Sequence, residues 1–161
     1  MGKTSGGVRL STDTKPNRTA SQKITQVISD IRKDGYSKQQ PFSIGYIENR
    51  MASFAINNGI ELPNKTIYMS AHSISHALRD SKKSKGIAVN DTDLISFPER
   101  RHSLDLYYDG KSFVYTDNKV KFIINPNYEM KISRNKTKKV AFITAGKTNE
   151  REFKMKKYRK I

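Results

Sequence analysis

Hydrophobic residues in the first third of the chain recur at the spacing of an amphipathic helix. One stretch predicts a helix that is capped by Ser21 and ends at Asp34-Gly35. A second stretch predicts a helix that opens at Ser43 and ends at Asn58-Gly59. The two apolar stripes are Ile24, Val27, Ile28 and Ile31, then Ile44, Ile47, Met51, Phe54 and Ala55. We expect both helices to pack against a core.

A short β-prone stretch and further helices are expected in the middle of the chain. Residues Thr66–Met69 predict a strand or an extended segment, and Ser70 would cap the helix that follows. That third helix is expected to end at Gly86. A brief helix should then begin at Asp91 and end at Pro98.

After residue 103 the period of the apolar pattern changes from helical to alternating. Leu104, Leu106 and Tyr108 alternate up to Asp109-Gly110, which is a tight hairpin signal. Further β-prone runs are the segments 113–115, 119–125, around 130, 140–144 and 151–161. Helices followed by an antiparallel meander predict an α+β fold.

The size and composition of the chain indicate a single domain. The sequence has 161 residues, of which 35% are hydrophobic, and this is enough for one modest core. Residues 1–19 hold almost nothing to bury, so we expect a flexible leader or a junction from a longer polypeptide. The folded domain is expected to span residues 20–161.

Positive charge is the strongest global signal. The 31 Lys and Arg residues exceed the 15 Asp and Glu residues by 16, and residues 119–161 alone carry +11 of this excess. Such an excess destabilises a compact state by self-repulsion unless an anionic partner is bound, and nucleic acid is the partner we expect. The C-terminal part is the predicted cationic surface.

Several classes of protein are disfavoured by what the sequence lacks. It contains no cysteine, which excludes disulfides and thiolate metal ligands and suits a reducing cytosol. No apolar run approaches the roughly 18 residues of a membrane span, and no signal-peptide pattern is present. We therefore expect a soluble protein without a membrane partner or a cofactor.

The third predicted helix carries the candidate chemistry. His72, His76, Arg79 and Lys83 follow at i, i+4, i+7 and i+11 and fall on one stripe, opposite Ile74 and Leu78. The simplest interpretation is a solvated polar face. A zinc site is disfavoured, because position 73 is Ser rather than Glu and Arg79 would repel the metal.

Metal-independent RNA cleavage fits the residue types of this stripe. The 2′-OH of RNA can attack the adjacent phosphorus and leave a cyclic phosphate, if one group takes a proton and another gives one. Histidine titrates in the range that either role needs, and cations stabilise the charge that develops on the phosphoryl oxygens. Spacing alone does not tell which of His72 and His76 would be the base and which the acid.

Other polar residues are interpreted as supporting groups. We assign Lys121, Lys147 and Arg101 to substrate binding, as cations near the predicted sheet and loops. His102 follows Arg101 in a predicted loop, where an exposed basic contact is favoured over catalysis. The sheet tyrosines, Tyr115 among them, are interpreted as packing residues, although an exposed ring could stack an unpaired base.

The segment from Thr66 to Ile161 contains, in this order, "IYMSAHSISHALRDSKKSKGIAV", "FPERRHSLDLYYDGKSFVYT", "KFIINPN" and "VAFITAGKT". By these motifs it resembles the nuclease domains of the barnase–EndoU–colicin–RelE (BECR) superfamily of phage and mobile-element proteins. The resemblance implies N-terminal helices followed by a four- or five-stranded antiparallel sheet, with a helical part over residues 20–62 and a BECR-like core over 63–161. It also implies metal-independent cleavage of RNA, often tRNA.

The same resemblance implies roles for individual residues. In the pattern His-x-x-Arg-Asp, His76 would be the acid-base residue and Arg79 a phosphate ligand, with Lys83 a weaker second. Thr144 in Thr-Ala-Gly would contact the transition state, whereas His72 has no counterpart in the pattern. We therefore expect a bacterial or phage toxin acting in the bacterial cytoplasm, neutralised by an acidic immunity or antitoxin protein. The alternative is a non-catalytic nucleic-acid-binding or virion-associated protein of the same fold.

Overall fold

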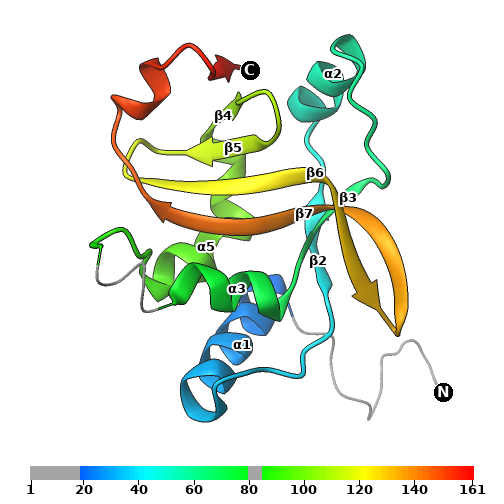
Figure 1. Ribbon diagram of the computed structural model, residues 1–161, viewed down its shortest axis with the longest axis vertical. Helices are drawn as coiled ribbons and strands as arrows, with labels where there is room; N and C mark the ends of the chain where they lie inside the picture. The colour runs from blue at the N-terminus through cyan, green and yellow to red at the C-terminus, as the bar shows by residue number, and fades with distance from the viewer. Residues whose placement is uncertain (1–18, 80–84) are drawn as a thin grey trace, which may run out of the picture.

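The computed structural model describes residues 19–79 and 85–161, which form one mixed sheet with helices packed on it (Figure 1). The strands are β2 (Phe42–Tyr46), β3 (Thr66–Met69), β4 (Asp105–Tyr108), β5 (Phe113–Thr116), β6 (Val120–Ile132), β7 (Asn135–Lys147) and β8 (Arg159–Lys160). The helices are α1 (Ala20–Asp34), α2 (Asn49–Asn57), α3 (Ala71–Leu78) and α5 (Asp91–Arg100), with 3-10 turns η1 (Arg101–Ser103) and η2 (Glu152–Lys154). The α+β class is therefore confirmed.

The sheet is larger than the expected four or five antiparallel strands. Its seven strands follow the order β2-β3-β7-β6-β5-β4-β8, and β3 pairs with β7 in parallel while the other pairs are antiparallel. The expectation of an all-antiparallel sheet is wrong because β3, which leads into α3, joins the edge of β7. The strand β2 then extends the sheet by pairing with β3.

The stretch from Ser43 to Ile47 belongs to a strand and a turn rather than to the predicted helix. Phe42 and Ile44 are buried while Ser43 is exposed, which is the period of a strand. Helix α2 begins only at Asn49, after Glu48. The helical spacing of Ile44, Ile47 and Met51 therefore joins two different elements, and the N-terminal part is not purely helical.

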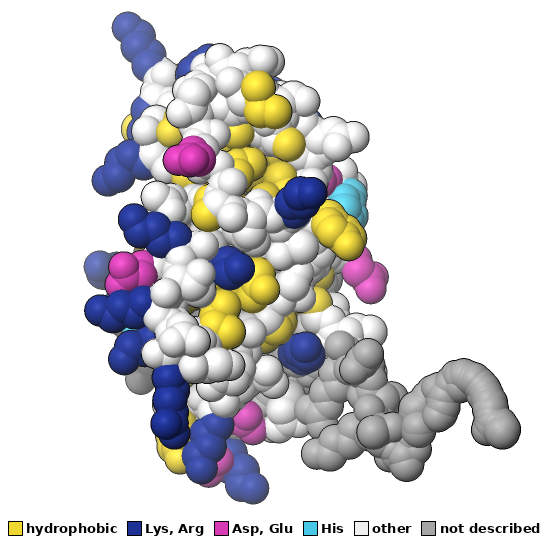
Figure 2. Space-filling view, turned by 90° about the vertical axis from the view of Figure 1, so that its right-hand side faces the viewer, with side chains coloured by type: hydrophobic (Ala, Val, Ile, Leu, Met, Phe, Trp, Pro, Cys, Tyr) yellow, Lys and Arg dark blue, Asp and Glu magenta, His cyan; other side chains and the backbone are white. Residues whose placement is uncertain are grey.

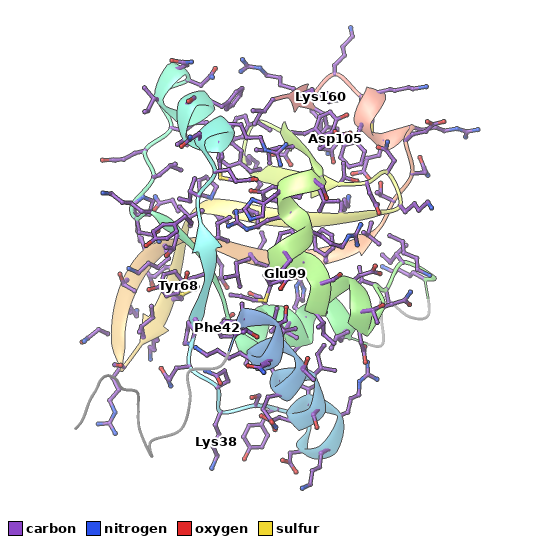
Figure 3. All side chains as sticks on the ribbon, turned by 180° about the vertical axis from the view of Figure 1, so that it is seen from behind. Lys38, Phe42, Tyr68, Glu99, Asp105 and Lys160 are labelled. Carbon is purple, nitrogen blue, oxygen red and sulfur yellow. The ribbon has the colours of Figure 1, made fainter. Side chains whose placement is uncertain are left out.

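The main core lies between the sheet and the helices α1, α3 and α5, and in Figure 3, which shows the molecule from behind, α5 is drawn in front of the strands. Phe97 of α5 stacks on Phe122 of β6 with ring centroids 4.2 Å apart, and Ile74 of α3 is fully buried. A smaller cluster of Tyr107, Val114 and Phe153 lies apart from this core. Because residues from α1 to β7 share the main core, residues 19–62 fold together with the rest of the sheet.

Helix ends agree with the sequence patterns at some positions and depart at others. Helix α1 ends at Gly35 as predicted, but its N-cap is Thr19, in a capping box with Gln22, and the Ser21 hydroxyl donates instead to the Ile95 carbonyl. Helix α5 continues through Pro98 to Arg100 rather than ending at the proline. Within residues 19–79 and 85–161, no helix has the length and apolar character needed to cross a membrane.

Candidate functional site

Helix α3 places only part of the predicted stripe as expected. Ser70 caps it, with its Oγ accepting from the Ser73 N–H at 3.1 Å, and Ile74 and Leu78 are buried as predicted. His72 is exposed and His76 is half-buried.

The predicted stripe does not continue past Leu78. The helix ends there, so Arg79 is an exposed residue in extended conformation (φ −61°, ψ 152°) rather than the third position of a helical row. The expected helix end at Gly86 is therefore wrong. Lys83 lies outside the described residues.

Thr144 lies on the other face of the sheet from α3. It pairs with Ile123, whose side chain packs against the cluster on the face away from α3. The next pair, Phe122 with Ala145, belongs to the core that α3 helps to form. Because paired residues of antiparallel strands share a face, the pairing places the Thr144 side chain on the face of the sheet away from α3, and its role beside His76 stays a prediction.

The three predicted substrate-binding cations have different surroundings. Lys147 is exposed at the end of β7. Lys121 forms an ion pair with Glu152, which also accepts from the Thr148 and Tyr158 hydroxyls and so fastens the C-terminal segment to the sheet. Arg101 is only 2% exposed, so its side chain lies below the surface and its role in substrate binding stays a prediction.

A second constellation, which the sequence patterns did not indicate, is centred on Glu48. The Glu48 carboxylate accepts hydrogen bonds from Tyr115 Oη at 2.8 Å and from Arg50 Nη2 at 3.2 Å. Its other oxygen, Oε2, lies 2.9 Å from His102 Nδ1. We call Glu48, Arg50, His102 and Tyr115 the Glu48 cluster.

The Glu48 cluster is assembled from elements that are distant in the sequence. Glu48 precedes α2, Arg50 lies in its first turn, and His102 belongs to η1 at the end of α5. Tyr115 comes from β5, which lies between β6 and β4 in the sheet. In Figure 3, α5, which carries the labelled Glu99, crosses in front of the sheet beside β2, which carries the labelled Phe42. The end of α5 therefore brings His102 to the turn between β2 and α2.

The carboxylate at the centre of the cluster is held in its ionised form. Burial raises the pKa of Glu48, but the hydrogen bonds from Tyr115, His102 and Arg50 and the Arg50 charge outweigh it, so the pKa of Glu48 lies below its usual value. Burial and the neighbouring Glu48 charge raise the pKa of Tyr115 far above its usual value. Tyr115 therefore stays a hydrogen-bond donor, and Glu48 stays an anion.

His102 is the exposed member of the cluster. Its side chain is 61% exposed, whereas that of Glu48 is 13% exposed. With Nδ1 directed at Glu48, the Nε2 atom makes no hydrogen bond to any residue of the described ranges. His102 lines a surface hollow of about 530 Å³, together with Tyr46, Asn49 and Arg101. The contact with Glu48 fixes the orientation of the imidazole, so Nε2 is the ring nitrogen that is open to a molecule bound in the hollow.

A buried arginine lies beneath this hollow. Arg101 Nη2 donates to the Tyr46 carbonyl at 2.6 Å, while its Nε and Nη1 are buried without a hydrogen-bond partner among the described residues. Gly45 makes room for the guanidinium, since a Cβ there would lie 2.6 Å from Arg101 Nη2. The φ of Gly45, +135°, is also one that side-chain-bearing residues rarely adopt. Two constraints thus require glycine at this position.

The sequence offered little signal for the Glu48 cluster. Its members lie on two segments more than 50 residues apart, since Glu48 and His102 are separated by 54 positions. Glu48 fell inside a predicted packing helix, and His102 was interpreted as an exposed basic contact.

Comparison with known proteins adds no family to these observations. No family model, no curated protein and no solved structure matches the chain. Among residues 19–79 and 85–161, no three His, Cys, Asp or Glu side chains are grouped so that they could hold a metal ion. The fold and the Glu48 cluster are therefore the basis for any functional assignment.

Proposed function

We propose that the protein is a metal-independent endoribonuclease and that His102, positioned by Glu48, is its proton-transfer residue. The observation that carries this proposal is the 2.9 Å contact between His102 Nδ1 and Glu48 Oε2, which leaves Nε2 accessible at a hollow. The resemblance to BECR nucleases and the net charge of +16 support RNA as the substrate.

The proposed reaction needs one proton acceptor beside the sugar. Neutral His102 takes the proton of the 2′-OH at Nε2 while the 2′-oxygen attacks the adjacent phosphorus. The bond from phosphorus to the 5′-oxygen breaks, a 2′,3′-cyclic phosphate forms, and the departing oxygen takes a proton from solvent. Ionised Glu48 stabilises the imidazolium that results. Glu48 is thus a positioning residue rather than the base, because its lowered pKa makes it a weak one.

Arg50, the cation of the Glu48 cluster, is proposed to assist, although it does not line the hollow itself. Its guanidinium lies 5.7 Å from the Tyr115 ring centroid, and its side chain is 32% exposed, so it is both fixed and accessible. A fixed cation beside the attacked phosphate stabilises the charge that develops on the phosphoryl oxygens. His76 and Arg79, predicted from the resemblance, stay the alternative centre for the same reaction.

We further propose that this activity belongs to a bacterial or phage toxin acting in the bacterial cytoplasm, with tRNA as a candidate target. A ribonuclease of this kind needs a neutralising protein, and an acidic one would complement the basic surface. The alternative function, non-catalytic nucleic-acid binding, shares the basic surface but leaves RNA intact.

The test is to incubate the purified protein with total tRNA in EDTA and to analyse fragment ends. We expect discrete fragments that end in 2′,3′-cyclic phosphate. RNA that is bound but not cut at any salt concentration would refute the nuclease proposal and favour the binding protein. Fragments that appear only when divalent metal is added would refute the metal-independent mechanism.

A further inference from the structure

A second cavity adjoins the hollow at His102. It measures about 620 Å³, within the range of small-molecule sites, and lies between α2, the turn after β2 and the segment that leads into β3. Its apolar lining includes Ala55, Ile56, Ile60 and Leu62. Figure 2 looks onto the side of the molecule that carries these elements and shows hydrophobic side chains exposed there.

The two cavities meet at the turn that bears Glu48. Tyr46, Ile47 and Asn49 line both of them. The Tyr46 side chain is 75% exposed, and its backbone carbonyl is fixed by the Arg101 guanidinium. A molecule whose phosphate lies at His102 therefore has an exposed aromatic ring and an apolar cavity directly beside it.

The far wall of this cavity is fixed before any ligand binds. Asn64 Oδ1 accepts from the Val140 N–H at 2.8 Å, and its Nδ2 donates to the Thr66 carbonyl. These bonds tie the segment before β3 to β7. The wall also carries Glu61 and Lys65. The Glu61 carboxylate can accept hydrogen bonds from the N–H groups of a base edge, and Lys65 can donate one to a carbonyl oxygen of a base, so this wall offers polar partners to the edge of a base.

We propose that this cavity holds an unpaired nucleobase next to the phosphate at His102, with the base stacked on Tyr46. Proteins commonly bind single-stranded RNA by stacking its bases on exposed aromatic rings, and the apolar lining disfavours the charged backbone. The inference rests on the proposed function for the position of the phosphate. The residues that build the cavity precede Thr66, so they lie outside the segment that resembles BECR nucleases.

The test uses RNA that cannot be cut. Oligonucleotides of about ten 2′-O-methyl nucleotides, each with one 2-aminopurine at a different position, are titrated with the protein while fluorescence is recorded. We expect quenching at one or a few positions with the wild type and with Tyr46→Phe, which keeps the ring. Tyr46→Ala should abolish this quenching and weaken binding about tenfold or more. Tyr36→Ala is the matched control, since Tyr36 is also exposed, at 58%, but does not line the cavity.

The outcomes distinguish failure of the nucleobase site from failure of the proposed nuclease activity. Quenching that Tyr46→Ala leaves unchanged, or no quenching at any position, would overturn the nucleobase site even if tRNA is cut in EDTA. Quenching that depends on Tyr46, in a protein that cuts no RNA, would establish the base site and refute the nuclease. Loss of quenching in Tyr36→Ala as well as in Tyr46→Ala would also overturn the specific site.

Discussion

Arg101 is a residue whose burial is hard to explain by stability. A buried guanidinium whose Nε and Nη1 atoms have no hydrogen-bond partner among the described residues is unfavourable, because the hydrogen bond from Nη2 to the Tyr46 carbonyl replaces only part of its lost hydration. Gly45 is also constrained to accommodate it. Such an arrangement indicates a function, and here the charge lies beneath the hollow where a phosphate is proposed to bind.

Replacing Arg101 should therefore separate stability from function. We expect Arg101→Met to leave the free energy of unfolding unchanged or to raise it by about 1 kcal/mol, because methionine fills the space without a buried charge. RNA cleavage should fall at least about tenfold, as the positive potential under the phosphate is lost. Urea denaturation and cleavage rates measure the two effects.

The neighbouring Arg100 supplies a matched control for this prediction. Its guanidinium is 35% exposed and forms an ion pair with Asp117 at 2.8 Å. Arg100→Met should lower the free energy of unfolding slightly and leave cleavage within about twofold. If Arg101→Met lost more than about 2 kcal/mol of stability, the interpretation of Arg101 as a functional rather than structural residue would be contradicted.

At the residue level, the sequence predicted local properties, such as helix capping and burial, better than contacts between distant residues. Ser70 as a helix cap and the burial of Ile74 and Leu78 are local properties, and both are confirmed. The contact between His102 and Glu48 joins residues from two elements, so no local pattern could predict it.

The β6–β7 hairpin is the element that best explains the positive charge. Lys131 and Lys136 are directly paired across its strands and are exposed, with Lys138 nearby on the same face, opposite Glu129. Like charges in a cross-strand pair are destabilising. The left edge of Figure 2, which is the side that faces the viewer in Figure 1, is also crowded with Lys and Arg side chains. We interpret this element as a contact for the RNA backbone.

The salt dependence of binding tests this interpretation. We expect the triple variant Lys131→Ala, Lys136→Ala, Lys138→Ala to bind single-stranded RNA more weakly, with a slope of log K against log salt that is smaller by about 2. The triple variant Lys33→Ala, Lys38→Ala, Lys111→Ala removes the same charge from other exposed sites and should keep the wild-type slope. Equal slopes in the two variants would show that the hairpin does not bind phosphate in particular.

Elements with a local signal were predicted, and those set by tertiary contacts were not. The alternation in residues 104–125 and the Asp109-Gly110 turn predicted β4, β5 and the start of β6. Strand β2 was missed because its short period-two pattern runs into helix α2 and the combined spacing imitates one helix. The end of α3 at Leu78 was also missed, because the next residue is Arg79 rather than a glycine or proline that would signal a helix end.

For the whole molecule, the sequence predicted the α+β class and the basic character but not the extent of the sheet. The extra strands come from the pairing of β2 with β3 and of β3 with β7. The second pairing joins residues that are more than 70 positions apart in the sequence. This pairing has a functional consequence, because it fixes the turn before α2, and with it Glu48 and Tyr46, beside the end of α5. The N-terminal third thus contributes to the proposed site.

The most direct test of the proposed centre compares His102→Ala with His76→Ala in single-turnover cleavage of tRNA in EDTA. Both variants remove one imidazole, and His102 is exposed enough for the substitution to leave the fold intact. We predict that His102→Ala lowers the cleavage rate about 10² to 10⁴-fold, and that this loss exceeds the loss in His76→Ala by at least about tenfold. Full activity in His102→Ala, with cleavage abolished in His76→Ala, would contradict the proposed centre and place catalysis on α3.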